Sequence, residues 1–183
     1  MYKAPELRVA AWLNTAAPIT LAELHGQVIV IEAFQMLCPG CVSHGLPQAK
    51  RIAHTFSGES LVVLGLHTVF EHVEVQGSYD ALAAFMHEYR VSFPVAIDQP
   101  GETGQLPETM SAYGMQGTPT LLLIDRAGIL RHRYFGAVED LRLGADIMSL
   151  LVQSVGSAAS PGRAEQRSGD PAARCNDDAC EVQ

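Results

Sequence analysis

The stretch that decides the fold is Val28–Pro47, with the sequence VIVIEAFQMLCPGCVSHGLP. Its first part, Val28–Phe34, is apolar except for Glu32, which is typical of a strand buried on both faces of a sheet. Two cysteines follow, Cys38 and Cys41, in the spacing C-x-x-C at the expected start of a helix. Free backbone N–H groups and the positive end of the helix dipole stabilise a thiolate there and lower its pKa. The stretch therefore predicts an exposed, ionised and nucleophilic first cysteine.

This spacing predicts disulfide exchange, with Cys38 as the attacking thiol and Cys41 as the resolving thiol. Cys38 opens a substrate disulfide to give a mixed disulfide, and Cys41, one turn along, attacks that intermediate and releases the product. Pro39 suits the first helical position, where its missing N–H costs nothing. Two alternatives remain: buried structural thiols, or half of a zinc site completed by His44.

A second motif, Thr118-Pro119, lies some eighty residues downstream at the start of an expected strand. A cis bond before Pro119 would bring the backbone of Thr118 beside the cysteines, where its N–H and C=O groups can pair with an extended substrate strand. The alternative is a trans proline that merely begins the strand. We expect substrate contacts from this pair and from Pro39 and Gly40 between the cysteines.

Glu32 interrupts the apolar run six residues before Cys38. Burial raises the pKa of a carboxyl group, which can then exchange protons near neutral pH. Glu32 is therefore the candidate proton acceptor for the Cys41 thiol, the alternative being a glutamate at a strand edge that reaches solvent. Three histidines could add positive charge near the thiols, or be ordinary surface residues: His44, His67 and His72.

The composition of the chain limits the class of protein, the partners and the location that it can have. The chain has 183 residues, 48% of them hydrophobic and 17% charged, which is typical of a globular domain with a sizeable core. A net charge of −8 argues against binding nucleic acid, and no apolar run is long enough to span a bilayer. We see no secretory signal, so we expect a cytoplasmic protein, or a periplasmic one if a leader has been removed. No cofactor or metal is expected.

The pattern of apolar residues predicts strands separated by helices, then a β-hairpin and a last helix. The expected strands are 7–13, 28–34, 61–66, 93–98, 121–124 and 129–135. The expected helices are a short turn at 19–24, 38–57, one capped by Ser78, 107–113 and 141–155. Segment 67–72 is expected to be a loop over the active face. Parallel strands joined by helices, with an antiparallel hairpin, predict a mixed sheet covered on both faces, a three-layer α/β/α sandwich.

The last residues differ from the rest in composition. Residues 1–156 read as one domain, and 157–183 contain almost no large apolar side chain, which predicts a mobile tail. The tail carries a second pair, Cys175 and Cys180, in the sequence CNDDAC. This pair could relay electrons to Cys38 and Cys41, since tethering gives effective concentrations on the order of millimolar. The alternatives are a local disulfide, a metal-binding tip that includes Asp177 and Asp178, or no function.

The CPGC motif, Pro47 in the following helix, and GTPT at 117–120 before LLLIDRAG resemble the thioredoxin superfamily. More narrowly, the chain is similar to TlpA-like and AhpC/TSA-related redoxins over about residues 5–153. The resemblance implies a thioredoxin-like fold, Cys38 as nucleophile, Cys41 as resolving cysteine, Pro119 as cis-proline and Glu32 as the buried acid. Leu37 stands where relatives usually carry Trp, and Pro47 lies one residue later than in many of them.

We therefore predict a thiol–disulfide oxidoreductase that acts on a disulfide-containing protein or a small thiol and is served by an electron-donating reductant. The first alternative is a peroxiredoxin-like peroxidase. Such enzymes typically carry P-x-x-x-[T/S]-x-x-C, but Ile31 and Gln35 occupy the two diagnostic places here. The second alternative is a non-enzymatic zinc- or copper-handling protein.

Overall fold

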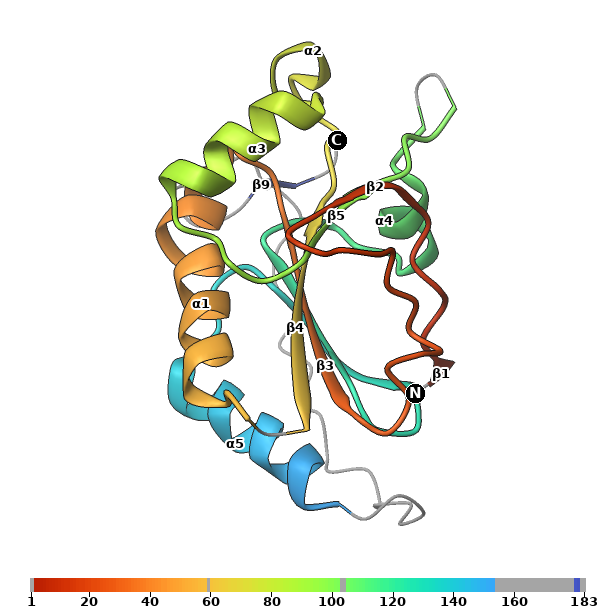
Figure 1. The fold of residues 1–183 in the computed structure, drawn as a ribbon, viewed down its shortest axis with the longest axis vertical. Helices are drawn as coiled ribbons and strands as arrows, with labels where there is room; N and C mark the ends of the chain where they lie inside the picture. The colour runs from red at the N-terminus through yellow and green to blue at the C-terminus, as the bar shows by residue number, and fades with distance from the viewer. Residues whose placement is uncertain (1, 59, 103–104, 154–179, 182–183) are drawn as a thin grey trace.

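A seven-stranded mixed sheet forms the centre of the molecule (Figure 1). The computed structural model describes residues 2–58, 60–102, 105–153 and 180–181. The strands lie in the order β1-β8-β7-β3-β4-β5-β2, and β3, β4 and β5 run parallel while the other pairs are antiparallel. Their bounds are β1 Tyr2–Lys3, β2 Val9–Leu13, β3 Val28–Phe34, β4 Leu61–His67, β5 Val95–Asp98, β7 Thr120–Ile124 and β8 Ile129–Phe135. The predicted mixed sheet is confirmed.

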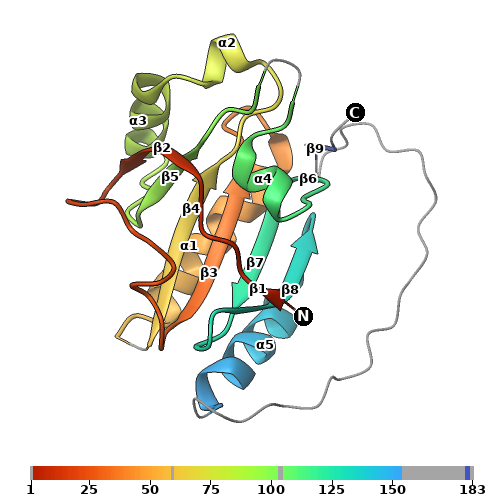
Figure 2. The same ribbon diagram turned by 90° about the vertical axis from the view of Figure 1, so that its right-hand side faces the viewer.

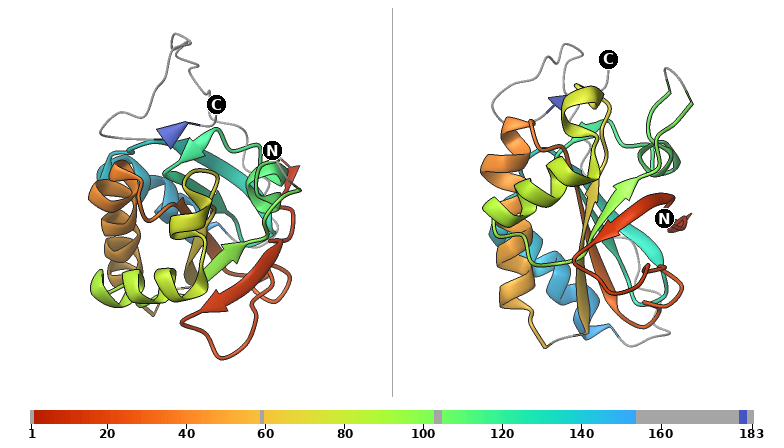
Figure 3. Two further views of the ribbon diagram at one scale, coloured as in Figure 1. Left: turned by 90° about the horizontal axis from the view of Figure 1, so that it is seen from above. Right: turned by 45° about the horizontal axis from the view of Figure 1, so that its top comes forward.

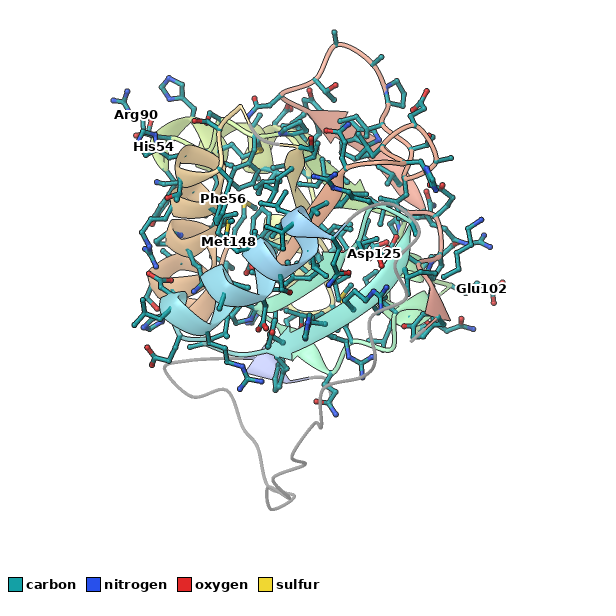
Figure 4. The ribbon with its side chains drawn as sticks, turned by 90° about the horizontal axis from the view of Figure 1, so that it is seen from below. His54, Phe56, Arg90, Glu102, Asp125 and Met148 are labelled. Carbon is teal, nitrogen blue, oxygen red and sulfur yellow. The ribbon has the colours of Figure 1, made fainter. Side chains whose placement is uncertain are left out.

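Helices cover both faces of this sheet. One face carries α1 (Leu46–Thr55), α3 (Tyr79–Glu88) and α5 (Asp140–Val152), and the other carries the short α4 (Glu108–Ala112) (Figure 1). Phe56, just after α1, and Met148 of α5 lie where these two helices meet (Figure 4). The predicted three-layer α/β/α sandwich is confirmed.

Strand β3 explains why the sheet needs cover on both sides. Its side chains alternate between two apolar clusters: Val28, Val30 and Phe34 pack toward α1, α3 and α5, whereas Ile29 and Ile31 pack toward α4. All seven residues of the strand are buried. A central strand buried on both faces fixes the position of whatever follows it, which here is the CPGC segment.

The helix after CPGC departs from the prediction of one continuous element. Cys41–Gly45 form a π-helical turn, η1, in which the N–H of Leu46 donates to the carbonyl of Cys41, and α1 follows. Pro47 stands in the first turn of α1, where it lacks an N–H and an ordinary α-helical ladder cannot run through it unbroken. The wider turn places Gly45 directly over β3.

Two local predictions differ from the structure, and two short elements were missed. The short helical turn expected at 19–24 appears as turns at 21–26 that belong to no helix, and His67, expected in a loop, belongs to β4, where it pairs with Phe34 and Ile97 on the neighbouring strands. The short elements β1 and α2 (Val73–Gln76) were not predicted. Pairing with strands distant in sequence decides β1 and the end of β4, so the local pattern does not reveal them. Within the described residues, no helix combines the length and the apolar character needed to cross a membrane.

A second, two-stranded sheet joins distant parts of the chain. Strand β6 (Gly117–Thr118) pairs antiparallel with β9 (Cys180–Glu181), and the two lie side by side in Figures 2 and 3. Residues 154–179, with Cys175, Asp177 and Asp178, lie outside the described residues. The division into a domain at 1–156 and a tail at 157–183 therefore stays a prediction.

Candidate active site

Cys38 lies just beyond the end of β3, at the start of the helical segment that Pro39 opens. The backbone N–H of Cys41 points at the Sγ atom of Cys38 from 3.3 Å. A donor from the first helical turn in this position would stabilise a thiolate, and the ionised state of Cys38 stays a prediction. The carbonyl oxygen of Thr118 stands 3.5 Å from the same Sγ. The sulfur is thus held between a helix start and the strand edge that precedes Pro119.

The expected exposure of Cys38 is wrong in this structure, since only 1% of the residue is accessible. The Thr118 backbone lies against the sulfur and contributes to its enclosure. The accessible surface beside it is apolar instead. Leu37 is 54% exposed and Pro39 is exposed, whereas Gly40 is buried. Leu37 and Pro39 therefore form the outer border of the site, and Gly40 does not.

Cys41 lies one turn along and is completely buried. Burial raises the pKa of its thiol strongly, and the hydrogen bond and charge of Cys38 raise it further. A thiol of this kind does not ionise unaided near neutral pH. Any step in which Cys41 attacks therefore requires a base that removes its proton.

Glu32 is the candidate for this base, and it is buried in the middle of the sheet on the face that η1 covers. Burial, with a further contribution from the charge of Cys38, raises its pKa from 4.5 to about 8. Its Oε1 atom has no hydrogen-bond partner among the described residues. A Cβ atom built on Gly45 would overlap this oxygen, so the glycine leaves the room that the carboxyl group occupies.

A cavity of about 410 Å³ reaches this carboxyl group from the molecular surface. Glu32, Gly45 and Pro119 line it together with residues that have exposed side chains, among them His44 and Arg51. The cavity therefore joins the carboxyl group to side chains on the molecular surface. The alternative in which Glu32 sits at an exposed strand edge is wrong.

The Thr118–Pro119 peptide bond is cis, as predicted. The N–H of Gly136 donates to the Pro119 carbonyl at 2.9 Å, and the Thr120 hydroxyl donates to the Gly117 carbonyl at 2.7 Å. These bonds fix the segment on both sides of the proline. Gly117 and Thr118 then form β6, an edge on which another strand can pair.

Gln35 is a positioning residue that the sequence analysis did not find in this role. It is buried, and its Oε1 atom accepts from the N–H groups of Phe70 and Glu71 and from the Gln76 side chain. Its Nε2 atom lies 3.2 Å from a Glu71 carboxylate oxygen and 3.5 Å from the Thr118 hydroxyl. Gln76 in turn accepts from the N–H of Leu37 at 3.1 Å. This network ties the residues before Cys38 to loop 68–72 and to the proline segment.

The histidines occupy three different settings. His44 is exposed and lies 2.7 Å from the Ser43 hydroxyl, and His72 is exposed just before α2. His67 is buried against the Phe34 ring, and burial lowers its pKa to about 4. His67 is therefore neutral near pH 7 and contributes no cationic charge. Among the described residues, no cluster of three or more His, Cys, Asp or Glu side chains is placed to hold a metal ion.

A cysteine pair at a helix start, a cis-proline segment against the first sulfur and a buried carboxyl group beneath the helix, all carried by this sheet, define a thioredoxin-like redox protein. The AhpC/TSA family model matches residues 2–133, and the chain belongs to the AhpC/TSA family.

Solved structures support the same fold. The chain is 57% identical to a thioredoxin-like superfamily protein, with a TM-score of 0.81, over 83% of this chain and 97% of that one. It is 44% identical to a thiol-disulfide isomerase from Corynebacterium glutamicum, with a TM-score of 0.78, over 82% and 98% of the two chains.

The curated relatives are larger proteins. The chain is 28% identical to the protein DipZ of Mycobacterium tuberculosis over 163 residues, which is 87% of this chain and 21% of DipZ. It is 35% identical over 98 residues to the NHL repeat-containing protein 2 of Gallus gallus, covering 51% of this chain and 13% of that protein. The chain thus spans about a fifth or less of the length of these relatives.

Proposed function

We propose that this protein is a thiol–disulfide oxidoreductase that exchanges disulfides through Cys38 and Cys41. The observation that carries the proposal is the setting of the Cys38 sulfur, which has a helical N–H at 3.3 Å and the Thr118 carbonyl at 3.5 Å. The first contact favours a thiolate, and the second places that sulfur beside a backbone edge suited to an extended peptide.

The reaction begins when the Cys38 thiolate attacks one sulfur of a substrate disulfide. A Cys38–substrate bond forms, the substrate disulfide breaks and the other substrate sulfur leaves as a thiolate. Cys41 then attacks the Cys38 sulfur, which releases the second substrate thiolate and leaves a Cys38–Cys41 disulfide. The substrate gains two electrons and the CPGC pair loses two.

Glu32 is the group that we propose to accept the proton released in the second step. The Cys41 thiol has a strongly raised pKa. Gly45 belongs to the same helical turn as Cys41, and the Glu32 carboxyl group, with a pKa of about 8, lies beneath this glycine. We place the Cys41 proton on Glu32 during resolution, directly or through water in the adjoining cavity. The carboxyl group then loses that proton to solvent along the same cavity.

The substrate class we propose is a disulfide-bonded protein or a small disulfide, since Leu37 and Pro39 offer an apolar border and β6 offers backbone pairing. A separate reductant would restore the CPGC dithiol. The cytoplasmic location expected from the sequence stays a prediction, and so does the metal-handling alternative.

Peroxide reduction is the other chemistry that the family suggests. It calls for a hydroxyl group three residues before the reactive cysteine, where Gln35 stands in this chain. Both ends of the Gln35 amide are engaged with the backbone and side chains of neighbouring segments. This engagement supports disulfide exchange over peroxide reduction.

The test compares two single substitutions in insulin reduction and in peroxide consumption. Cys38→Ser should abolish insulin reduction, whereas Cys41→Ser should accumulate a Cys38–insulin mixed disulfide that mass spectrometry detects. Ser111→Ala, on the exposed side of α4, serves as the control for handling and should keep full activity. Insulin reduction that survives Cys38→Ser, or peroxide turnover far above it in the unsubstituted protein, would overturn the proposal.

A further inference from the structure

Strand β9 occupies the backbone edge to which the proposed function assigns the substrate. Cys180 is the register partner of Thr118, and Glu181 is the partner of Gly117. The pairing is antiparallel and joins residues more than sixty positions apart. The chain therefore lays a segment of its own C-terminal part along β6.

The register brings a cysteine to the proline segment. Residues directly opposite each other in an antiparallel pair have Cα atoms roughly 4.5–5.5 Å apart. The backbone of Cys180 is therefore adjacent to Thr118, whose carbonyl oxygen lies 3.5 Å from the Cys38 sulfur. Strand pairing thus brings the backbone of Cys180 beside the segment that contacts the nucleophile.

We propose that β9 is an internal substrate strand, and that Cys180 exchanges with the oxidised CPGC pair. The Cys180 thiolate attacks the Cys38 sulfur of the Cys38–Cys41 disulfide. A Cys38–Cys180 bond forms, the Cys38–Cys41 bond breaks and Cys41 leaves as a thiolate that takes up a proton. One disulfide replaces another, so the step needs no outside oxidant or reductant. This inference rests on the proposed function of Cys38.

Two consequences follow for the activity. A docked β9 competes with a substrate peptide for the edge of β6, so only the fraction of molecules with β9 displaced binds substrate. The Cys38–Cys180 bond also holds the nucleophile in a form that small thiols can reopen. The relay expected from the sequence requires Cys175 as well, which lies outside the described residues, whereas this inference requires Cys180 alone.

The covalent step is tested by peptide mapping of the full-length chain. Cys175→Ser and Cys180→Ser form a matched pair, since each variant leaves one cysteine in the same tryptic peptide, 175–183. Both are equilibrated with oxidised and reduced dithiothreitol, quenched in acid, alkylated and digested. In Cys175→Ser, peptide 175–183 should be linked to peptide 9–50 through Cys38. This link should be roughly tenfold or more above that in Cys180→Ser, because strand pairing raises the effective concentration of Cys180.

Three results would overturn the inference: equal linkage in the two variants, linkage only between separate molecules, or no linkage while insulin reduction is intact. Loss of insulin reduction in every variant and in the unsubstituted protein would instead count against the proposed function. The two failures are therefore distinguishable.

The docking step has its own test. Proline is poorly tolerated within a paired strand, so Glu181→Pro should release β9 without touching the CPGC pair. We expect the KM for insulin to fall roughly two- to fivefold with kcat unchanged, since the competent fraction rises. Glu181→Gln is the control, because it keeps the strand and should leave KM unchanged. An unchanged KM in Glu181→Pro would contradict the competition.

Discussion

Two carboxyl groups buried in this sheet, those of Asp98 and Glu32, differ in the hydrogen-bond donors that surround them. Asp98, at the end of β5, accepts from the N–H groups of Thr109 and Met110 at 2.8 and 3.0 Å and from the Thr68 hydroxyl at 2.9 Å. Glu32, in β3, has an Oε1 atom without a partner among the described residues. Burial raises the pKa of both groups, but hydrogen bonds oppose the shift only at Asp98.

The difference separates a carboxyl group held in place by hydrogen bonds from one that we propose as a proton acceptor. The donors around Asp98 replace its hydration, so its charge anchors the start of α4 to β5. Glu32 is left with a pKa of about 8, a cavity leading to solvent and a neighbouring cysteine pair. Burial alone does not distinguish these two roles, whereas the presence of donors does.

The largest loss of stability is expected at Asp98. Asp98→Ala leaves two buried N–H groups of α4 without an acceptor, which should lower the free energy of unfolding by about 4 kcal/mol. Asp98→Asn keeps one acceptor oxygen and should cost about half as much by the same reasoning. Urea denaturation of both variants measures this. A loss below that of an ordinary surface substitution in Asp98→Ala would contradict the anchoring role.

At Glu32, by contrast, a substitution is expected to raise the free energy of unfolding. The folded protein holds this carboxyl group protonated up to about pH 8, whereas the unfolded chain releases the proton near pH 4.5. Stability is therefore lost as pH rises between these values, and Glu32→Gln should recover it. Since one pKa unit is worth about 1.4 kcal/mol and the pKa of Glu32 rises from 4.5 to about 8, we expect a gain of about 4 kcal/mol at pH 8.

The gain in Glu32→Gln should vanish at pH 4. Denaturation curves at both pH values check this, and Asp98→Asn should be destabilised at both. A Glu32→Gln variant that is less stable than the unsubstituted protein at pH 8 would contradict the raised pKa.

A smaller effect is expected at Gly45. A Cβ atom there would overlap the Glu32 carboxyl oxygen and stand 3.0 Å from the Cβ of Pro119. Gly45→Ala should therefore lower the free energy of unfolding by about 2 kcal/mol, as an overpacked site does. Gly144→Ala in α5 is the control, because no atom lies within 4 Å of its built Cβ, and it should be neutral or stabilising. Equal losses in the two variants would exclude the contact with Glu32.

The sequence was enough to predict the fold class and most of the long elements. The apolar runs of β3 and β4 and the hairpin pattern that ends in β8 are local signals, and the structure contains strands at these places. The capping role of Ser78 is also local, and its hydroxyl accepts from the N–H of Ala81. The two-residue strands β1, β6 and β9 form by pairing with partners far along the chain, so no local pattern predicts them.

The residues of the site also fall into those that the local sequence predicts and those that only the folded chain reveals. Cys38, Cys41 and Glu32 stand within ten residues, and one strand-to-helix connection brings them together. The contacts of Gln35 join it to residues 35 to 83 positions away, which only the folded chain reveals. The same holds for Asp98, which looks like an ordinary polar residue at a strand end, and for the enclosure of Cys38 by Thr118. The catalytic and relay assignments themselves stay predictions until they are measured.

The most direct test of the account is a rapid-quench measurement of both steps of disulfide exchange in the unsubstituted protein and in Glu32→Gln, between pH 6 and 9. In the unsubstituted protein, the resolution of the mixed disulfide by Cys41 should accelerate with an apparent pKa near 8, the pKa of Glu32. Glu32→Gln should slow this step about 10- to 100-fold and remove that pH dependence, while the attack of Cys38 changes much less. Equal slowing of both steps, or an unchanged resolution step, would contradict the assignment of Glu32 as the proton acceptor.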